Sequence, residues 1–151
     1  MNFRNPHGLG LFVLALMLPA PRAWAADVWL DVMVVHASKV DKGCDARLAP
    51  FESELREAIP SAGYRLVSQD AKRVSLRDSV SFDLGNRHEV YIRPVAAGDD
   101  AVDLQLLVVD GSTVPAKRMR QAVKVMYHKA FAIGHPLPDG SSKLLLIQTG
   151  P

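Results

Sequence analysis

The chain has 151 residues, with 18 Lys and Arg against 16 Asp and Glu, which gives a formal net charge of +2. This near balance does not indicate a nucleic-acid partner, because domains that bind nucleic acid carry clustered positive charge. The single cysteine excludes an internal disulfide framework, and a chain of this length is typical of one domain that folds without such cross-links.

The N-terminus has the features of an export signal. An apolar run from Leu9 to Leu18 follows Arg4, and the small-x-small pattern AWA ends at residue 25. The run is shorter than the roughly 20 residues that a membrane-spanning helix needs. We therefore predict a signal peptide over residues 1–25 and a single exported domain over 26–151, in the periplasm or outside the cell. No transmembrane segment is expected after signal removal, which would also leave equal numbers of acidic and basic residues.

The first predicted element of the domain is a strand over residues 28–37, "VWLDVMVVHA". Apolar residues occur on both of its alternating faces, which favours a strand buried on both sides. Residues 45–60 then predict one amphipathic helix, which must pack on a sheet. Its apolar side recurs at helical spacing through Leu48, Phe51, Leu55 and Ile59.

Strands are predicted for the rest of the chain after Gly63. The segments "YRLVSQD" and "KRVSLRD" are expected as two strands around a short turn. Alternating strands follow in "SVSFDLG", "HEVYIRPV", "AVDLQLLVVD" and "RQAVKVMYHKAFAIG". The fold class is therefore mostly β (α+β): an antiparallel two-layer β-sandwich of about seven to eight short strands with one amphipathic helix.

The last predicted strand contains four consecutive aliphatic residues, Leu144 to Ile147. The turn signal at Asp139-Gly140 predicts a hairpin that returns this strand against residues 130–134. A continuous aliphatic run is typical of an interior strand. The alternative is a strand at a sheet edge, which would offer Leu144 and Leu146 to a partner.

Two surface features are candidates for contacts with other molecules. Basic residues cluster without an acidic neighbour and form either a solvated strand face or a patch for an anion or partner: Lys117, Arg118, Arg120 and Lys124. Cys44 lies in the polar segment "DKGCD", where it is either an incidental thiol or a site for an intermolecular disulfide.

No catalytic spacing is evident in the predicted domain. Its histidines are not paired at metal-ligand spacing, and neither a Gly-x-Ser-x-Gly elbow nor a Gly-rich phosphate loop occurs. We therefore expect no cofactor, no metal and no enzyme activity. The alternative is a small hydrolase or ligand-binding protein whose site is assembled in space around His88, His128 or His135.

The segments "DARLAPFESEL", "YRLVSQD", "LGNRHEVYIRP" and "AIGHPLPDGSSKLLLIQT" together give a resemblance over about residues 28–149. The chain resembles small exported bacterial proteins of unassigned activity, which have a signal peptide, one short helix and a compact β-fold. The resemblance implies this fold and export, and it transfers no catalytic residue. The resulting hypothesis is a non-catalytic interaction or assembly module of the bacterial cell envelope, with a protein partner bound through a surface or an edge strand.

Overall fold

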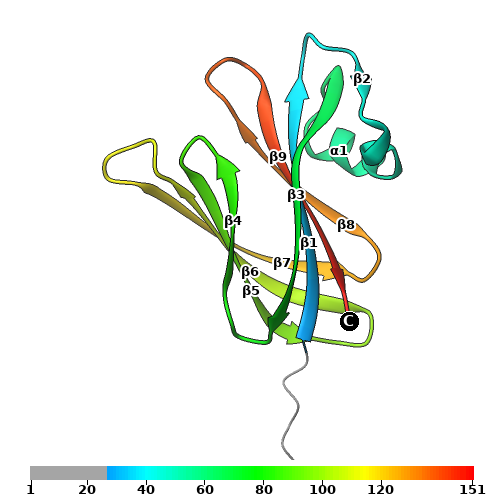
Figure 1. Ribbon diagram of the computed structural model, residues 1–151, viewed down its shortest axis with the longest axis vertical. Helices are drawn as coiled ribbons and strands as arrows, with labels where there is room; N and C mark the ends of the chain where they lie inside the picture. The colour runs from blue at the N-terminus through cyan, green and yellow to red at the C-terminus, as the bar shows by residue number, and fades with distance from the viewer. Residues whose placement is uncertain (1–26) are drawn as a thin grey trace, which may run out of the picture.

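The computed structural model describes residues 27–151, so the predicted signal peptide over residues 1–25 lies outside the described residues. Two short helical segments, η1 and α1, lie among nine strands (Figure 1). The elements in chain order are β1 (Asp27–Ser38), β2 (Gly43–Cys44), η1 (Ala46–Phe51), α1 (Glu52–Ala58), β3 (Gly63–Ser75), β4 (Val80–Gly85), β5 (His88–Ala97), β6 (Ala101–Asp110), β7 (Lys117–Met126), β8 (Ala130–Pro136) and β9 (Ser142–Gly150).

The strands form two sheets that face each other. The five-stranded sheet has the order β2-β3-β1-β9-β8, and the four-stranded sheet has the order β4-β5-β6-β7. Neighbouring strands are antiparallel throughout, except that β2 runs parallel to β3. The predicted mostly β sandwich-like fold is confirmed, with nine strands if the two-residue β2 is counted.

The main core lies between the two sheets and follows from strand alternation. In β1 the even-numbered residues Val28, Leu30, Val32 and Val34 are buried in this core. They meet inward side chains of the four-stranded sheet, such as Val90, Ile92 and Leu104, which are also buried. Burial of large aliphatic side chains is the main stabilising contribution to such a sandwich.

A second core covers the outer face of the five-stranded sheet. The odd-numbered residues of β1 there, Met33 and Val35, pack in one cluster with Leu48 and Leu55 of the helical segments. Gly134 of β8 allows the close approach of α1, because a Cβ at this position would lie 2.1 Å from Cδ1 of Ile59. The predicted helical region is therefore in the predicted place, with Leu48 and Leu55 buried and Phe51 and Ile59 partly buried.

Two details of the predicted elements are wrong. The helix over residues 45–60 consists of a 3₁₀ segment, with Pro50 inside it, followed by a short α-helix. The two strands expected around a turn near Asp70 are one strand, β3, which pairs with β1 along its whole length. A continuous partner strand satisfies the backbone of β3, so the chain does not turn at a polar segment that lacks Gly and Pro.

The last strand occupies the centre of the five-stranded sheet. β9 pairs with β1 on one side and with β8 on the other, and Phe131 to Gly134 lie opposite Ile147 to Leu144. The interior strand predicted against residues 130–134 is confirmed. The alternative edge contact through Leu144 and Leu146 is wrong, because both side chains are fully buried under the helical segments and both edges of β9 are paired.

Candidate functional site

One edge of the four-stranded sheet is formed by β7, a ten-residue strand that, within residues 27–151, pairs only with β6. Its outward side chains include Arg118, Arg120 and Lys124, which we call the basic row. All three are exposed, and among the described residues only Lys124 has a carboxylate within ion-pair distance, with Nζ 3.7 Å from Asp103 Oδ1. Three of the four residues of the predicted basic patch thus lie on one face of an edge strand, and Lys117 begins the same strand.

The inward side of β7 changes from buried to exposed along its length. Val125 lies opposite Val102 and is 2% exposed, whereas Met119 lies opposite Val108 and is 47% exposed. Both side chains face the interior of the sandwich, so the five-stranded sheet covers one end of β7 and leaves the other uncovered. In Figure 1 the yellow turn between β6 and β7 and the orange-red turn between β8 and β9 lie at the same end of the molecule, apart from each other.

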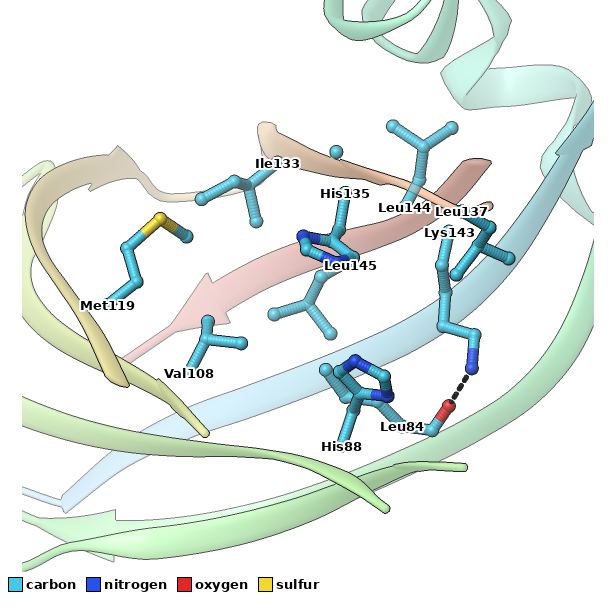
Figure 2. A pocket seen from close by; sticks show the side chains of 11 residues that line it. Leu84, His88, Val108, Met119, Ile133, His135, Leu137, Lys143, Leu144 and Leu145 are labelled. Carbon is cyan, nitrogen blue, oxygen red and sulfur yellow. Dashed lines mark hydrogen bonds between the residues drawn. The ribbon is translucent and has the colours of Figure 1, made fainter. Parts of the chain in front are cut away.

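A cavity of about 40 Å³ lies between the sheets at this uncovered end. Its walls are mainly apolar and come from both sheets, as Figure 2 shows: Leu84, Val108 and Met119 from one sheet, and Ile133 and Leu145 from the other. Three polar side chains complete the lining, namely His88, His135 and Lys143. Such a concave apolar site with a few polar groups is typical of a binding site rather than of a solvated strand face.

The polar side chains hold one another in place. The ring centroids of His88 and His135 are 5.6 Å apart, and Nε2 of His88 lies 3.3 Å from Oδ1 of Asp110. Nδ1 of His88 lies 3.0 Å from the carbonyl oxygen of Asn86. The ammonium group of Lys143 donates to the carbonyl oxygen of Leu84 across the two sheets, at 2.6 Å.

Asp110 stays ionised at this rim. The hydroxyl and the backbone N–H of Ser112 donate to its carboxylate and lower its pKa below the ordinary value. A charged carboxylate beside His88 orients the imidazole, so this edge of the cavity has a fixed polar arrangement.

The three histidines of the alternative hypothesis are not all brought together. His88 and His135 meet at the cavity, whereas His128 lies in the turn between β7 and β8 with a φ of 61°. Its backbone N–H donates to the carbonyl oxygen of Thr149, and the residue lies at the opposite end of β8 from His135. The cavity lining contains no Ser, Thr or Cys side chain.

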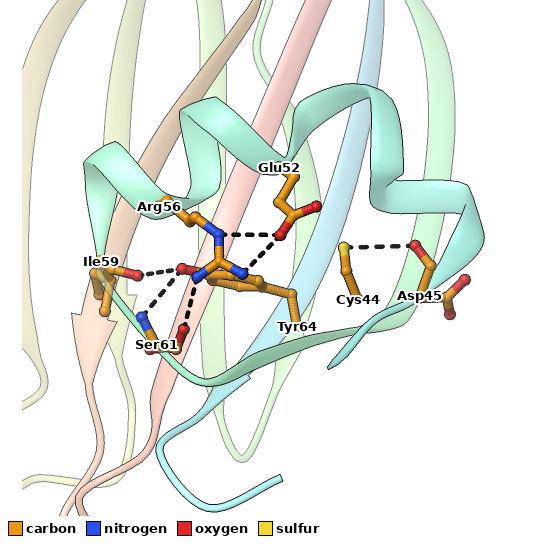
Figure 3. A network of polar contacts seen from close by, with 7 residues as sticks. All are labelled: Cys44, Asp45, Glu52, Arg56, Ile59, Ser61 and Tyr64. Carbon is orange, nitrogen blue, oxygen red and sulfur yellow. Dashed lines mark hydrogen bonds and ion pairs between the residues drawn. The ribbon is translucent and has the colours of Figure 1, made fainter. Parts of the chain in front are cut away.

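Cys44 lies in β2 beside the helical segments and is partly buried. Its thiol donates to the carbonyl oxygen of Asp45 at 3.6 Å (Figure 3). Burial raises the pKa of the thiol, and the negative charge of Glu52 raises it further. Since the thiolate is the reactive form, this environment lowers reactivity. The intermolecular disulfide stays a prediction.

The polar network in Figure 3 fixes the helical segments to the sheet. The guanidinium of Arg56 donates to Glu52 Oε1 at 2.6 and 3.0 Å and to the carbonyl oxygen of Ser61 at 3.1 Å. It also lies over the ring of Tyr64, whose hydroxyl donates to the carbonyl oxygen of Ile59 at 2.7 Å. These groups are paired with one another, which is typical of a structural network.

The comparisons with known proteins give no identification: no family model, curated protein or solved structure matches the chain. Within residues 27–151, no group of three or more potential metal ligands is found. In the same residues, no helix has the length and apolar character needed to cross a membrane.

Sequence reasoning identified the basic row and two of the cavity histidines but missed Met119, Ile133 and Lys143. The alternation of Met119, Gln121, Val123 and Val125 was a usable signal for an inward face of β7. The inward face of β7 is uncovered at one end because the two sheets diverge there. This divergence is not encoded in any local sequence pattern.

Proposed function

We propose that the protein is a non-catalytic interaction module that binds an extended segment of a partner protein along the free edge of β7. One observation carries the proposal: β7 is a ten-residue edge strand, and the inward-facing side chains at one end of it, Met119 among them, are exposed. A strand added to an exposed edge gains main-chain hydrogen bonds, and its alternate side chains can enter the uncovered core.

The other sheet edges are less suitable for strand addition. β4 has six residues and a register shift near Gly85, and α1 packs against β8. β3 has an irregular register at Val67, and Lys72 of β3 donates to the carbonyl oxygen of Ser81 on β4, which closes that side of the sandwich. Bulges and covering elements are the usual means by which proteins protect an edge.

The proposed location is the bacterial cell envelope. It is supported by the features of residues 1–25, which predict export. The partner is therefore expected in the periplasm, at a membrane surface or outside the cell. The alternative function at His88 and His135 is not favoured over strand addition, because the cavity opens beside β7 and is small.

The test compares two charge-reversal variants of the tagged protein in co-purification from detergent-solubilised envelopes, with mass spectrometry as readout. Arg118→Glu with Arg120→Glu alters the basic row, and Lys39→Glu with Lys42→Glu makes the same change in an exposed loop. We expect a stoichiometric partner that the first variant loses and the second retains. Loss of the partner under reductant alone would instead point to Cys44.

Hydrogen exchange then locates the contact. Bound partner should slow the exchange of β7 amides, because an added strand pairs with them, while the amides of β4 remain unchanged. A partner that leaves β7 unprotected would contradict the proposal even if the charge reversal weakens binding.

A further inference from the structure

We infer that the added strand has an alternating acidic and aliphatic sequence, and that one of its aliphatic side chains, of valine or leucine size, occupies the cavity between Met119 and Ile133. This inference rests on the proposed function and specifies the partner segment. It follows from three properties of the site: the orientation of side chains along β7, the size of the cavity and the charge of the outward face.

The orientation of side chains along β7 predicts the alternating sequence of the added strand. Side chains of neighbouring strands that lie opposite each other point to the same face of a sheet. A strand on the free edge of β7 would therefore place every second side chain beside Met119 and Gln121, on the interior face. The intervening side chains would lie beside Arg118 and Arg120, on the outer face.

The cavity lies where an inward side chain of that strand would arrive. Met119 of β7 and Ile133 of β8 border it from opposite sheets, at the side where both strands are edges (Figure 2). A strand added to the free edge of β7 would lie about 5 Å from β7, over this opening.

Size restricts the side chain. The cavity has about 40 Å³, and one water-sized group needs about 10–15 Å³ in the same measure, so about three such groups fit. Valine and leucine have side chains of this size, whereas an aromatic ring would require the sheets to move apart. The walls are mainly apolar, and the ammonium group of Lys143 already donates to the carbonyl oxygen of Leu84, so an aliphatic side chain is favoured at this position over a charged one.

Charge defines the outward positions. The basic row presents three cations, of which only Lys124 has a carboxylate of the described residues within ion-pair distance. Glutamate or aspartate at the outward positions of the added strand would pair with this row across the two strands. A second copy of the chain is disfavoured as the occupant, because two β7 strands side by side would bring like charges together.

The test uses labelled synthetic peptides and fluorescence anisotropy at low salt. A peptide of alternating Val and Glu is compared with one of alternating Val and Lys and one of alternating Ser and Glu. We expect measurable binding of the first only, weakened by added salt, because surface charge interactions are screened. Equal binding of the Val-Glu and Val-Lys peptides would overturn the acidic assignment.

Variants test the cavity itself. Val108→Phe fills it from within, and Val109→Phe is the matched change on the outward face of the same strand. Loss of one aliphatic anchor should weaken Val-Glu peptide binding about tenfold or more in the first variant and leave it unchanged in the second. Unfolding transitions of both variants establish that they fold.

Met119→Trp is a second variant that should weaken binding of the Val-Glu peptide, because Met119 is half-exposed and can be enlarged without packing into the core.

If both cavity variants bind like the wild type while the peptide slows amide exchange in β7, strand addition stands and the cavity assignment is wrong. If no peptide binds but the envelope partner still protects β7, the sequence assignment is wrong and the proposed function stands. A molecular mass that doubles with rising protein concentration, together with slowed exchange of the β7 amides, would assign the edge to a second copy instead.

Discussion

Asp45 shows how a single side chain begins the helical region. Its carboxylate accepts hydrogen bonds from the side chain and the backbone N–H of Arg47, and these contacts lower its pKa from 3.8 to about 2. A group with a lowered folded-state pKa contributes stability above its ordinary pKa, and the contribution is lost as the pH falls through the folded value.

We therefore predict that the free energy of unfolding of the wild type falls more steeply than that of Asp45→Asn between pH 3.8 and about 2. Asparagine keeps an acceptor for the cap but does not titrate. Urea unfolding at several pH values measures the difference between the two proteins. Arg47→Gln removes the side-chain contact but keeps the backbone N–H donor, so it should give a slope between those of the wild type and Asp45→Asn. Parallel curves for wild type and Asp45→Asn would contradict the assignment.

Individual residues of the site were only partly predictable. Arg118 and Arg120 could be identified from the sequence alone, because they lie in a cluster of basic residues. His88 and His135 could be noted as candidates, but their proximity depends on β5 and β8, which belong to different sheets. Asp110, which lies beside His88 at the cavity, was not identified as a candidate from the sequence.

At the scale of elements, the position of the helical region was predictable, because its apolar residues recur clearly at helical spacing. Its division into a 3₁₀ segment and an α-helix was not predictable. Pro50 cannot donate a backbone hydrogen bond, and the segment before Glu52 takes the tighter 3₁₀ form. In β3, local polarity suggested a turn, but pairing with β1 outweighed it. Local patterns therefore locate elements well when their apolar face is covered, and less well when a neighbouring strand supplies the stabilisation.

The attachment of α1 depends on Leu55, which is fully buried between the helical segments and the sheet. We predict that Leu55→Ala lowers the free energy of unfolding by about 2–5 kcal/mol, because it removes buried methyl groups and leaves a cavity. Chemical denaturation measures this value. Glu57→Ala on the exposed side of the same helix is the control and should change stability by about 0.5 kcal/mol or less. Similar effects of the two changes would mean that α1 is not held by this contact.

At the scale of the whole molecule, the two-layer architecture was predictable from the number of alternating strands and the single amphipathic helix. The strand order was not, because β9 reaches its place between β1 and β8 through contacts between distant parts of the sequence. The cavity depends on this order, since its walls come from both sheets.

The central position of β9 gives a prediction for the whole fold. Removing residues 143–151 takes away the partner of both β1 and β8 together with four buried aliphatic side chains, Leu144 to Ile147. We expect the truncated protein to lose its cooperative thermal transition in circular dichroism. Removing Pro151 alone, which is exposed and outside the strand, should leave the transition unchanged. A cooperative transition in the longer truncation would show that β9 is dispensable.

The same arrangement bears on the order in which the protein can fold. β1, near residue 30, pairs on one side with β3 and on the other with β9, near residue 146. During synthesis, β1 is therefore without its second neighbour until nearly all of the described sequence has followed. Pairings between distant segments are slow to form, and an unpaired strand is prone to aggregation. The nascent chain is thus expected to depend on holding chaperones until β9 emerges and completes the sheet.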